Sequence, residues 1–222
     1  MRILRYLSDS MLKNIVLIRG NENDSNIYLV DKEIIIDTGT GENFMDAKEF
    51  IQDHFDISKI KTIINTHCHY DHTGGDKRFR DWLDADVMIH KNDAYPLEHG
   101  TEAVMAELFN ENAKAITVNK KLVDGDIIHT KNFTIEVVHT PGHTSGSICL
   151  FEKKHRFLIT GDTLFENAFG RTDLPSGSSQ QMKESLKIIL DLSPKHIFPG
   201  HGNMKSSGID FLIKQLLNIR LL

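Results

Sequence analysis

Short runs of apolar, mostly β-branched residues alternate with polar turn residues along the first half of the chain. Such runs predict β-strands, and the spacing of Phe44, Ala47 and Ile51 predicts a helix that Asn43 caps. The expected strands are residues 14–18, 26–30, 33–36, 61–65 and 86–90, and further helices are expected from near residue 73 and over residues 101–110. This half therefore combines strands with intervening helices.

The second half restarts the pattern with a predicted meander of hairpins. Its expected strands are residues 127–130, 133–139, 147–151 and 156–160. A helix over 179–190, a short strand at 197–198 and a last helix from Ser207 follow, and Ser207 and Asp210 are spaced like a capping box. No repeat or linker separates the halves, so a single domain over residues 1–222 is expected. Two halves of this kind favour paired sheets flanked by helices.

The lengths of the apolar runs and the number of cysteines indicate the cellular location of the protein. The longest uninterrupted apolar runs, such as residues 15–18, are far below the roughly 18 residues that a membrane-spanning helix requires, so no membrane partner is expected. Residues 8–10 interrupt any signal-peptide core. Cys68 and Cys149 are too few for a disulfide scaffold, which is typical of a reducing compartment. These features predict a cytoplasmic protein.

The charge of the chain and its histidine content bear on two different kinds of partner, nucleic acids and metal ions. Thirty-one acidic against 26 basic residues give a net charge of −5, and the basic residues are scattered, so no nucleic-acid partner is expected. Twelve histidines are many for 222 residues, and histidine is the commonest metal ligand. Their positions therefore decide what chemistry the chain supports.

The densest group of metal-ligand side chains comes between a predicted strand and a predicted helix. Side chains alternate in direction on an extended backbone, so His67 and His69 are placed to bind one ion. After a bend, Asp71 and His72 are placed to reach a second ion. The same alternation directs Cys68 away from the metals, which favours a packing role for this residue.

Three later segments each place one more ligand-type residue directly after a predicted strand. These residues are His143, Asp162 and His201, and each has a glycine beside it that allows a sharp turn of the backbone. With the first group they make seven metal-ligand donors from four loops.

On these motifs the chain resembles the metallo-β-lactamase superfamily, whose signature His-x-His-x-Asp-His stands unbroken at residues 67–72. The resemblance covers roughly residues 14–202 and implies an α+β fold, a four-layer αββα sandwich with a binuclear metal site at one edge. It implies that zinc is the expected metal at both positions, with iron or manganese as alternatives. The implied ligands are His67, His69 and His143 for the first ion, Asp71, His72 and His201 for the second, and Asp162 between them.

Other segments narrow the expected activity within the superfamily. The commonest two-zinc β-lactamases use cysteine at the position of Asp162, whereas residues 161–165 and 170–175 are similar to glyoxalase II, a hydroxyacylglutathione hydrolase. The 21 residues after His201 leave no room for the helical domain with which long-form glyoxalase II holds glutathione. The expected function is hydrolysis of a small-molecule thioester or ester; substrate identity and oligomeric state stay open.

Two other activities of the superfamily are kept as alternatives. A persulfide dioxygenase carries a similar Gly-Arg-Thr-Asp segment and holds a single iron, here through His67, His143 and Asp162. A metal-dependent ribonuclease shares the ligand set but fits the acidic charge less well.

The hypothetical mechanism uses a hydroxide that bridges the two metals as the nucleophile on a thioester carbonyl. A thiol has a pKa of about 8.5, so its thiolate leaves without a general acid. Asp71 and Asp37 are the carboxylates assigned to catalysis. Asp71 would act as a metal ligand. Asp37 would either orient the imidazole of a ligand histidine or serve only as a turn residue. Arg171 either binds a substrate carboxylate or pairs with Asp173, and Tyr70 either contacts substrate or packs in the core.

Overall fold

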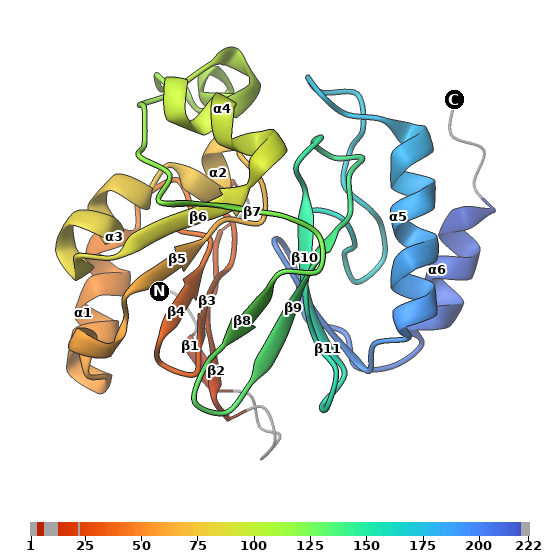
Figure 1. Cartoon of the computed structure of the whole chain (residues 1–222), viewed down its shortest axis with the longest axis horizontal. Helices are drawn as coiled ribbons and strands as arrows, with labels where there is room; N and C mark the ends of the chain where they lie inside the picture. The colour runs from red at the N-terminus through yellow and green to blue at the C-terminus, as the bar shows by residue number, and fades with distance from the viewer. Residues whose placement is uncertain (1–3, 7–12, 22, 219–222) are drawn as a thin grey trace.

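The computed structural model describes residues 4–6, 13–21 and 23–218. Two β-sheets pack face to face, and helices cover the outer face of each sheet, which gives the four layers of an αββα sandwich (Figure 1). The predicted fold class is therefore confirmed. The predicted interruption of a signal-peptide core at residues 8–10 lies outside the described residues.

The first sheet has seven strands in the order β1-β2-β3-β4-β5-β6-β7. Neighbouring strands are antiparallel from β1 to β4 and parallel from β4 to β7. The strands are β1 (Leu4–Tyr6), β2 (Ile15–Ile18), β3 (Ile27–Val30), β4 (Ile34–Ile36), β5 (Thr62–Ile64), β6 (Asp86–His90) and β7 (Lys120–Leu122).

The second sheet has five strands in the order β12-β11-β10-β9-β8. Only β11 and β12 are paired in parallel, and the other neighbours are antiparallel. The strands are β8 (Ile127–His129), β9 (Thr134–His139), β10 (Ile148–Glu152), β11 (Phe157–Gly161) and β12 (His196–Pro199).

Helices cover the outer faces of the two sheets on opposite sides of the molecule (Figure 1). On the side of the first sheet lie α1 (Phe44–His54), α2 (Tyr70–Thr73), α3 (Asp76–Leu83) and α4 (Lys91–His99), with 3-10 helices η1 (Ile57–Lys59), η2 (Glu102–Val104) and η3 (Ala106–Phe109). On the side of the second sheet lie α5 (Ser179–Leu192) and α6 (Ile209–Leu217).

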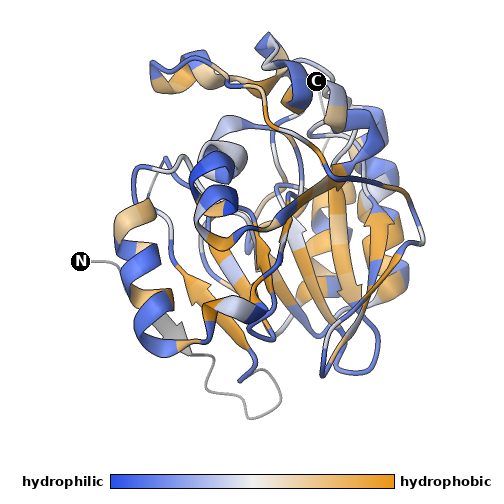
Figure 2. Ribbon diagram, turned by 60° about the vertical axis from the view of Figure 1, so that its left-hand side comes forward, coloured by the Kyte–Doolittle hydropathy of each residue, from blue (hydrophilic) through white to orange (hydrophobic). Residues whose placement is uncertain are grey.

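Strands β2 to β4, β10 and β11 are buried on both faces because their sheets are covered on both sides, whereas β7, β8 and β9 have exposed residues. Figure 2 shows that strand residues are largely hydrophobic. In β2, Ile15 and Leu17 face the core between the sheets, whereas Val16 and Ile18 face the core beneath the helices. The second sheet has its own outer core, to which α5 and α6 contribute seven buried side chains: Met182, Leu186, Ile189, Ile209, Leu212, Ile213 and Leu216. The period-2 alternation of strands thus builds three apolar layers.

Several local predictions differ from the structure. The segment predicted as a helix over 101–110 forms two 3-10 helices that Met105 separates, with a backbone φ of 59°. The preceding helix, α4, was not predicted because Pro96 lies inside it, where proline is unfavourable. Strand β7 was missed too, since two of its three residues are exposed lysines.

Both predicted helix caps are wrong. The Asn43 side chain makes no hydrogen bond to α1, because its amide Nδ2 donates to Asp24 Oδ2 over 2.7 Å. Helix α6 is preceded by Gly208 in a left-handed conformation, so Ser207 and Asp210 do not form a capping box. No helix within the described ranges is long and apolar enough to cross a bilayer.

Candidate metal centre

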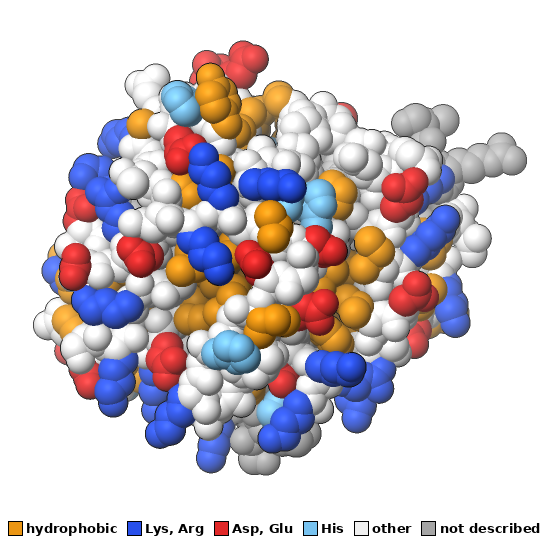
Figure 3. Space-filling model, in the orientation of Figure 1, with side chains coloured by type: hydrophobic (Ala, Val, Ile, Leu, Met, Phe, Trp, Pro, Cys, Tyr) orange, Lys and Arg blue, Asp and Glu red, His pale blue; other side chains and the backbone are white. Residues whose placement is uncertain are grey.

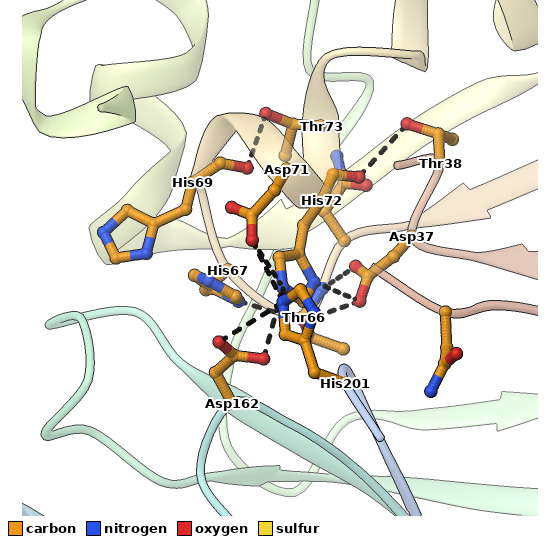
Figure 4. Close-up of polar contacts among 12 residues, drawn as sticks. Asp37, Thr38, Thr66, His67, His69, Asp71, His72, Thr73, Asp162 and His201 are labelled. Atoms are coloured by element: carbon orange, nitrogen blue, oxygen red, sulfur yellow. Dashed lines mark hydrogen bonds and ion pairs between the residues drawn. The ribbon is translucent and has the colours of Figure 1, made fainter. Parts of the chain in front are cut away.

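The seven predicted ligands follow strands whose carboxyl ends meet at one edge of the sandwich. In the first sheet β4 and β5 are parallel, and residues 67–72 follow β5. In the second sheet β9, β11 and β12 point the same way, because β10 is antiparallel to both β9 and β11. His143, Asp162 and His201 follow these three strands. The topology therefore brings side chains from four loops together. Figure 4 shows the predicted ligand side chains of residues 67–72, Asp162 and His201.

The first group consists of His67, His69 and His143. One ligand nitrogen of each histidine lies within 4.8 Å of those of the other two. His69 Nδ1 and His143 Nε2 approach to 2.9 Å. The second nitrogen of His143, Nδ1, lies 2.7 Å from the carbonyl oxygen of Arg171, which fixes Nδ1 as the protonated nitrogen and leaves Nε2 with a lone pair.

The second group consists of Asp71, His72 and His201, whose ligand atoms also lie within 4.8 Å of one another. His201 Nε2 is 3.0 Å from Asp71 Oδ2 and 3.3 Å from His72 Nε2. Figure 4 shows these side chains converging from opposite sheets. The arrangement places one carboxylate and two imidazoles around one point.

Asp162 lies between the two groups. Its Oδ1 is 3.2 Å from His72 Nε2, and its Oδ2 is 3.6 Å from His143 Nε2 and 3.8 Å from His201 Nε2. One oxygen of a single carboxylate thus faces the second group while the other lies near a histidine of the first. This is the position from which a carboxylate can bridge two cations.

Buried polar atoms without partners test whether the site fits a metal. Within the described part of the chain, His67 Nε2 and His69 Nε2 are buried and lack a hydrogen-bond partner, and buried Asp162 Oδ1 makes an ion-pair contact with His72. An unpaired buried polar atom is unfavourable, and native proteins rarely contain several together. The residues present therefore fit a cation, which these lone pairs would bind.

Charge interactions divide the histidines into two kinds. Burial and the neighbouring imidazoles lower the pKa of His67 well below its usual range, and burial with His143 beside it lowers the pKa of His69 to about 3. Burial opposes the charged form of His72 as well, but Asp162, Asp37 and Asp71 raise its pKa well above the usual range. His67 and His69 are therefore neutral at pH 7 with free lone pairs, and a metal that binds His72 displaces a proton.

Asp37 directly follows β4 and supports His72 from behind. Its Oδ2 lies 2.8 Å from His72 Nδ1, and its two oxygens accept hydrogen bonds from the backbone N–H and hydroxyl of Thr66. The structure thus gives Asp37 the orienting position that the sequence left open beside a plain turn. With Nδ1 donating to Asp37, the opposite nitrogen of His72 faces Asp162 and His201 (Figure 4).

We predict that Asp37→Asn weakens binding of the second metal by about 10- to 100-fold. The amide nitrogen would face His72 Nδ1, force that nitrogen to accept, and so move the ring proton to the nitrogen that a metal requires. Titration of stripped protein with zinc, monitored by calorimetry, measures the two affinities separately. Asp31→Asn is the matched control, because Asp31 is also buried and accepts from Thr130 and Asn132. Equal losses in both variants would contradict the orienting role.

The comparisons with known proteins agree with this geometry. Residues 20–201 match the family model described as the metallo-β-lactamase superfamily, which is more than half of the chain. The chain belongs to this superfamily. A probable metallo-hydrolase of Methanocaldococcus jannaschii is 32% identical over 198 residues, 86% of this chain and 93% of that protein.

Two further comparisons place the chain within the superfamily. A hydroxyacylglutathione hydrolase of Pelagibacter ubique is 33% identical over 149 residues, which are 67% of this chain and 54% of that protein. The crystal structure of the B3 metallo-β-lactamase BLEG-1 superposes with a TM-score of 0.77 at 26% identity, covering 89% of this chain and 96% of that one. The protein is thus a metal-dependent hydrolase of the metallo-β-lactamase superfamily.

Sequence reasoning missed Asp93, a buried carboxylate that joins two of the loops that carry predicted metal ligands. Its Oδ2 accepts from the backbone N–H of Cys68 over 3.0 Å and from the hydroxyl of Thr144 over 2.7 Å. Cys68 lies between two predicted ligands, and Thr144 follows His143. Asp93 comes three residues after β6, which is parallel to β5. Its position after the carboxyl end of a neighbouring parallel strand is the sequence feature that could have indicated a role near the metal ligands.

A second buried carboxylate, Asp76, supports the same edge. Its Oδ1 accepts from Thr38 Oγ1 over 2.8 Å and its Oδ2 from Asn65 Nδ2 over 2.6 Å. Burial raises the pKa of Asp76 to about 7, although both hydrogen bonds oppose the shift. The folded state therefore holds this proton more tightly than the unfolded chain, where aspartate has a pKa of about 3.9.

We predict that Asp76 makes the metal-free protein less stable as the pH rises from about 4 to 7. Over this range the unfolded chain has lost the proton and the folded state still binds it, so the stabilisation is complete below the unfolded pKa and is lost by about pH 7. At about 1.4 kcal/mol per pKa unit, the change is at most about 4 kcal/mol. Urea unfolding of wild type and Asp76→Asn at several pH values measures it. If the stability difference between the two proteins is independent of pH, the assignment is wrong.

The two predicted substrate contacts are placed differently. The Tyr70 ring packs against Phe109, with centroids 5.6 Å apart, and Tyr70 does not line the hollow beside the metal ligands. Arg171 does line that hollow, but its guanidinium forms two hydrogen bonds to Asp173, of 2.8 and 2.6 Å. The structure therefore favours packing for Tyr70 and the ion pair for Arg171, the alternatives that the sequence left open.

The remaining conspicuous residues lie in the packed interior. Cys68 belongs to the core beneath the helices of the first sheet, and Cys149 to the outer core of the second. His139 stacks on His90, with ring centroids 4.1 Å apart, and is not part of the three ligand groups found among the described residues. The position of Cys68 agrees with the packing role expected for it.

Proposed function

We propose that this metal-dependent hydrolase binds two divalent ions, zinc in the first place, and cleaves small thioesters. The observation that carries the two-ion proposal is the presence of two complete ligand groups with Asp162 between them. Two such ions, when bound, would lower the pKa of a water molecule and polarise a carbonyl group. Iron or manganese would suit the same nitrogen and oxygen ligands.

The chain's own residues supply orientation and position. Asp37 and the carbonyl of Arg171 hold the rings of His72 and His143, so that each presents its other nitrogen to the centre. Asp93 ties the loop of His67 and His69 to the loop of His143. Rigid placement of this kind supports a site that is assembled before the substrate arrives.

Thioesters are favoured by what lines the hollow beside the ligands. Among the described residues around it, the titratable side chains are the predicted ligands His69, Asp71, His143 and Asp162, together with Arg171. None of these is a free acid that could protonate an amine as it leaves. A thiolate leaves without that help, since thiols have a pKa of about 8.5. The similarity to the hydroxyacylglutathione hydrolase of Pelagibacter ubique supports the same chemistry.

The alternatives receive less support. A dioxygenase would hold one iron on His67, His143 and Asp162. The second ligand group, Asp71, His72 and His201, would then bind no metal. A ribonuclease needs a basic surface, and Figure 3 shows basic and acidic side chains interspersed over the face in view. We further propose a cytoplasmic location, for which the two buried free thiols are suited, and no membrane or nucleic-acid partner.

Metal content and activity test the proposal together. The protein is purified without a metal-chelating tag, its metals are counted by mass spectrometry, and thiol release from S-acyl compounds is followed with a thiol reagent. We expect two ions per chain and hydrolysis that a chelator abolishes and added zinc restores. One iron per chain, with oxygen consumption on a glutathione persulfide, would instead establish the dioxygenase. Cleavage of structured RNA without thioester hydrolysis would establish the ribonuclease.

A further inference from the structure

Two hollows lie side by side at the predicted metal centre. The smaller, about 250 Å³, reaches the ligands His69, Asp71, His143 and Asp162. The larger, about 840 Å³, is next to it. Leu108 and Phe109 of η3 line both hollows, so a molecule bound at the ligands can continue past η3 into the larger space.

The smaller hollow has an apolar wall beyond the ligands. Met105, Leu108 and Phe109 form one side of it, and Phe165 and Leu174 belong to the loop after β11. Leu108 is 60% exposed and belongs to this contiguous apolar wall. The backbone at Met105 is left-handed, with φ 59°, a conformation that is uncommon for non-glycine residues and that turns the chain between η2 and η3. This wall fits an apolar group of the substrate.

The larger hollow is polar but carries no positive charge among its described lining residues. Amide side chains of Asn21, Asn23 and Asn110 surround it, together with Thr40, and its charged side chain is Glu42. In the smaller hollow the one cation, Arg171, is already paired with Asp173. In the larger hollow, substrate carboxylates or phosphates would therefore meet Glu42 and no cation among the described lining residues. Neutral hydrogen-bonding groups would find amides and a hydroxyl.

We propose that the thioester cleaved here is uncharged, with a short apolar acyl group in the smaller hollow and a neutral, amide-bearing thiol arm in the larger one. This inference rests on the proposed thioester hydrolysis and specifies its substrate class. Water adds to the acyl carbonyl, a C–O bond forms and the C–S bond breaks, so a carboxylic acid and a thiol are released without any change of oxidation state. The bulkier thiol half takes the larger hollow because only that space is wide enough.

Three synthetic thioesters separate the possibilities on the zinc-loaded protein. They are S-butanoyl-N-acetylcysteamine, S-acetyl-N-acetylcysteamine and S-butanoyl-glutathione. Two added methylenes should raise kcat/KM of the butanoyl over the acetyl cysteamine compound by roughly tenfold. The glutathione compound carries two carboxylates and one ammonium group and is net negative, so Glu42 should repel it, and it should be hydrolysed at least about tenfold more slowly than its neutral counterpart at low salt.

Variants connect these preferences to the two hollows. Leu108→Asn should reduce the butanoyl-to-acetyl ratio severalfold, and Glu42→Gln should reduce the discrimination against glutathione. Ile188→Asn is the control, because Ile188 is another exposed aliphatic residue, on α5 and outside both hollows, and its variant should keep both ratios.

The possible outcomes are distinct. Faster hydrolysis of the glutathione compound, or no gain from the longer acyl group, would overturn this inference and leave thioester hydrolysis standing. Hydrolysis of none of the three compounds by fully metal-loaded protein would overturn the proposed function and this inference with it.

Discussion

Replacing Asp162 by asparagine should reduce kcat/KM by at least about 10³-fold and leave fewer than two ions per chain. Residues that merely orient metal ligands are worth about 10- to 100-fold, so a carboxylate placed between both ligand groups should matter more. Its two oxygens lie 3.2 Å from His72 Nε2 and 3.6 Å from His143 Nε2, and an amide has only one oxygen to offer. Mass spectrometry of metal-loaded protein and steady-state kinetics give the two readouts.

Asp191→Asn is the control for this substitution. Asp191 is an exposed carboxylate at the end of α5, so its replacement makes the same change of charge away from the centre. This variant should keep two ions and wild-type activity. If Asp162→Asn also kept two ions and an activity within tenfold of wild type, Asp162 would not bridge the metals, and the two groups would act as separate sites.

The ligands were predictable because they break a strong pattern. The strands before residues 67–72, Asp162 and His201 are largely buried, and a polar residue after such a strand has no packing reason to occur. Parallel strands then bring their carboxyl ends to one edge, so residues as distant in sequence as His72 and His201 come within 3.3 Å. The pattern therefore indicates a candidate metal centre, and the topology brings its residues together.

The surroundings of the centre were less predictable because they depend on tertiary contacts. Residues 101–110 have helical spacing, but packing at the rim turns the backbone left-handed at Met105 and leaves two 3-10 helices. Asp93 shows the same limit: in the sequence it is one acidic residue of a helix, and only the fold brings it to Cys68 and Thr144. Alternatives left open for Arg171 and Asp37 needed the positions of Asp173 and His72.

Gly200→Ala should prevent assembly of the second metal group while leaving the fold intact. A Cβ atom at residue 200 would lie 2.4 Å from Asp162 Oδ1 and 2.6 Å from His72 Cε1, closer than real Cβ contacts allow. The backbone of Gly200 cannot move away easily, because its N–H donates to the Gly161 carbonyl and its carbonyl accepts from Asn26 N–H. The methyl group must therefore push two ligands apart. Overpacking of this kind costs about 1–3 kcal/mol, but the larger effect should fall on zinc binding and activity.

Gly125→Ala separates loss of stability from loss of the metal group. A Cβ at Gly125 meets no atom within 4 Å, yet its φ of 80° makes any side chain there strained. This variant should lose stability, by about 1 kcal/mol, and still bind two zinc ions. Gly200→Ala should keep the circular dichroism of a folded protein and bind at most one zinc ion, because the side-chain atoms nearest to the added methyl group belong to Asp162 and His72. Two bound ions and full activity in Gly200→Ala would mean that this close approach is not what holds the second group together.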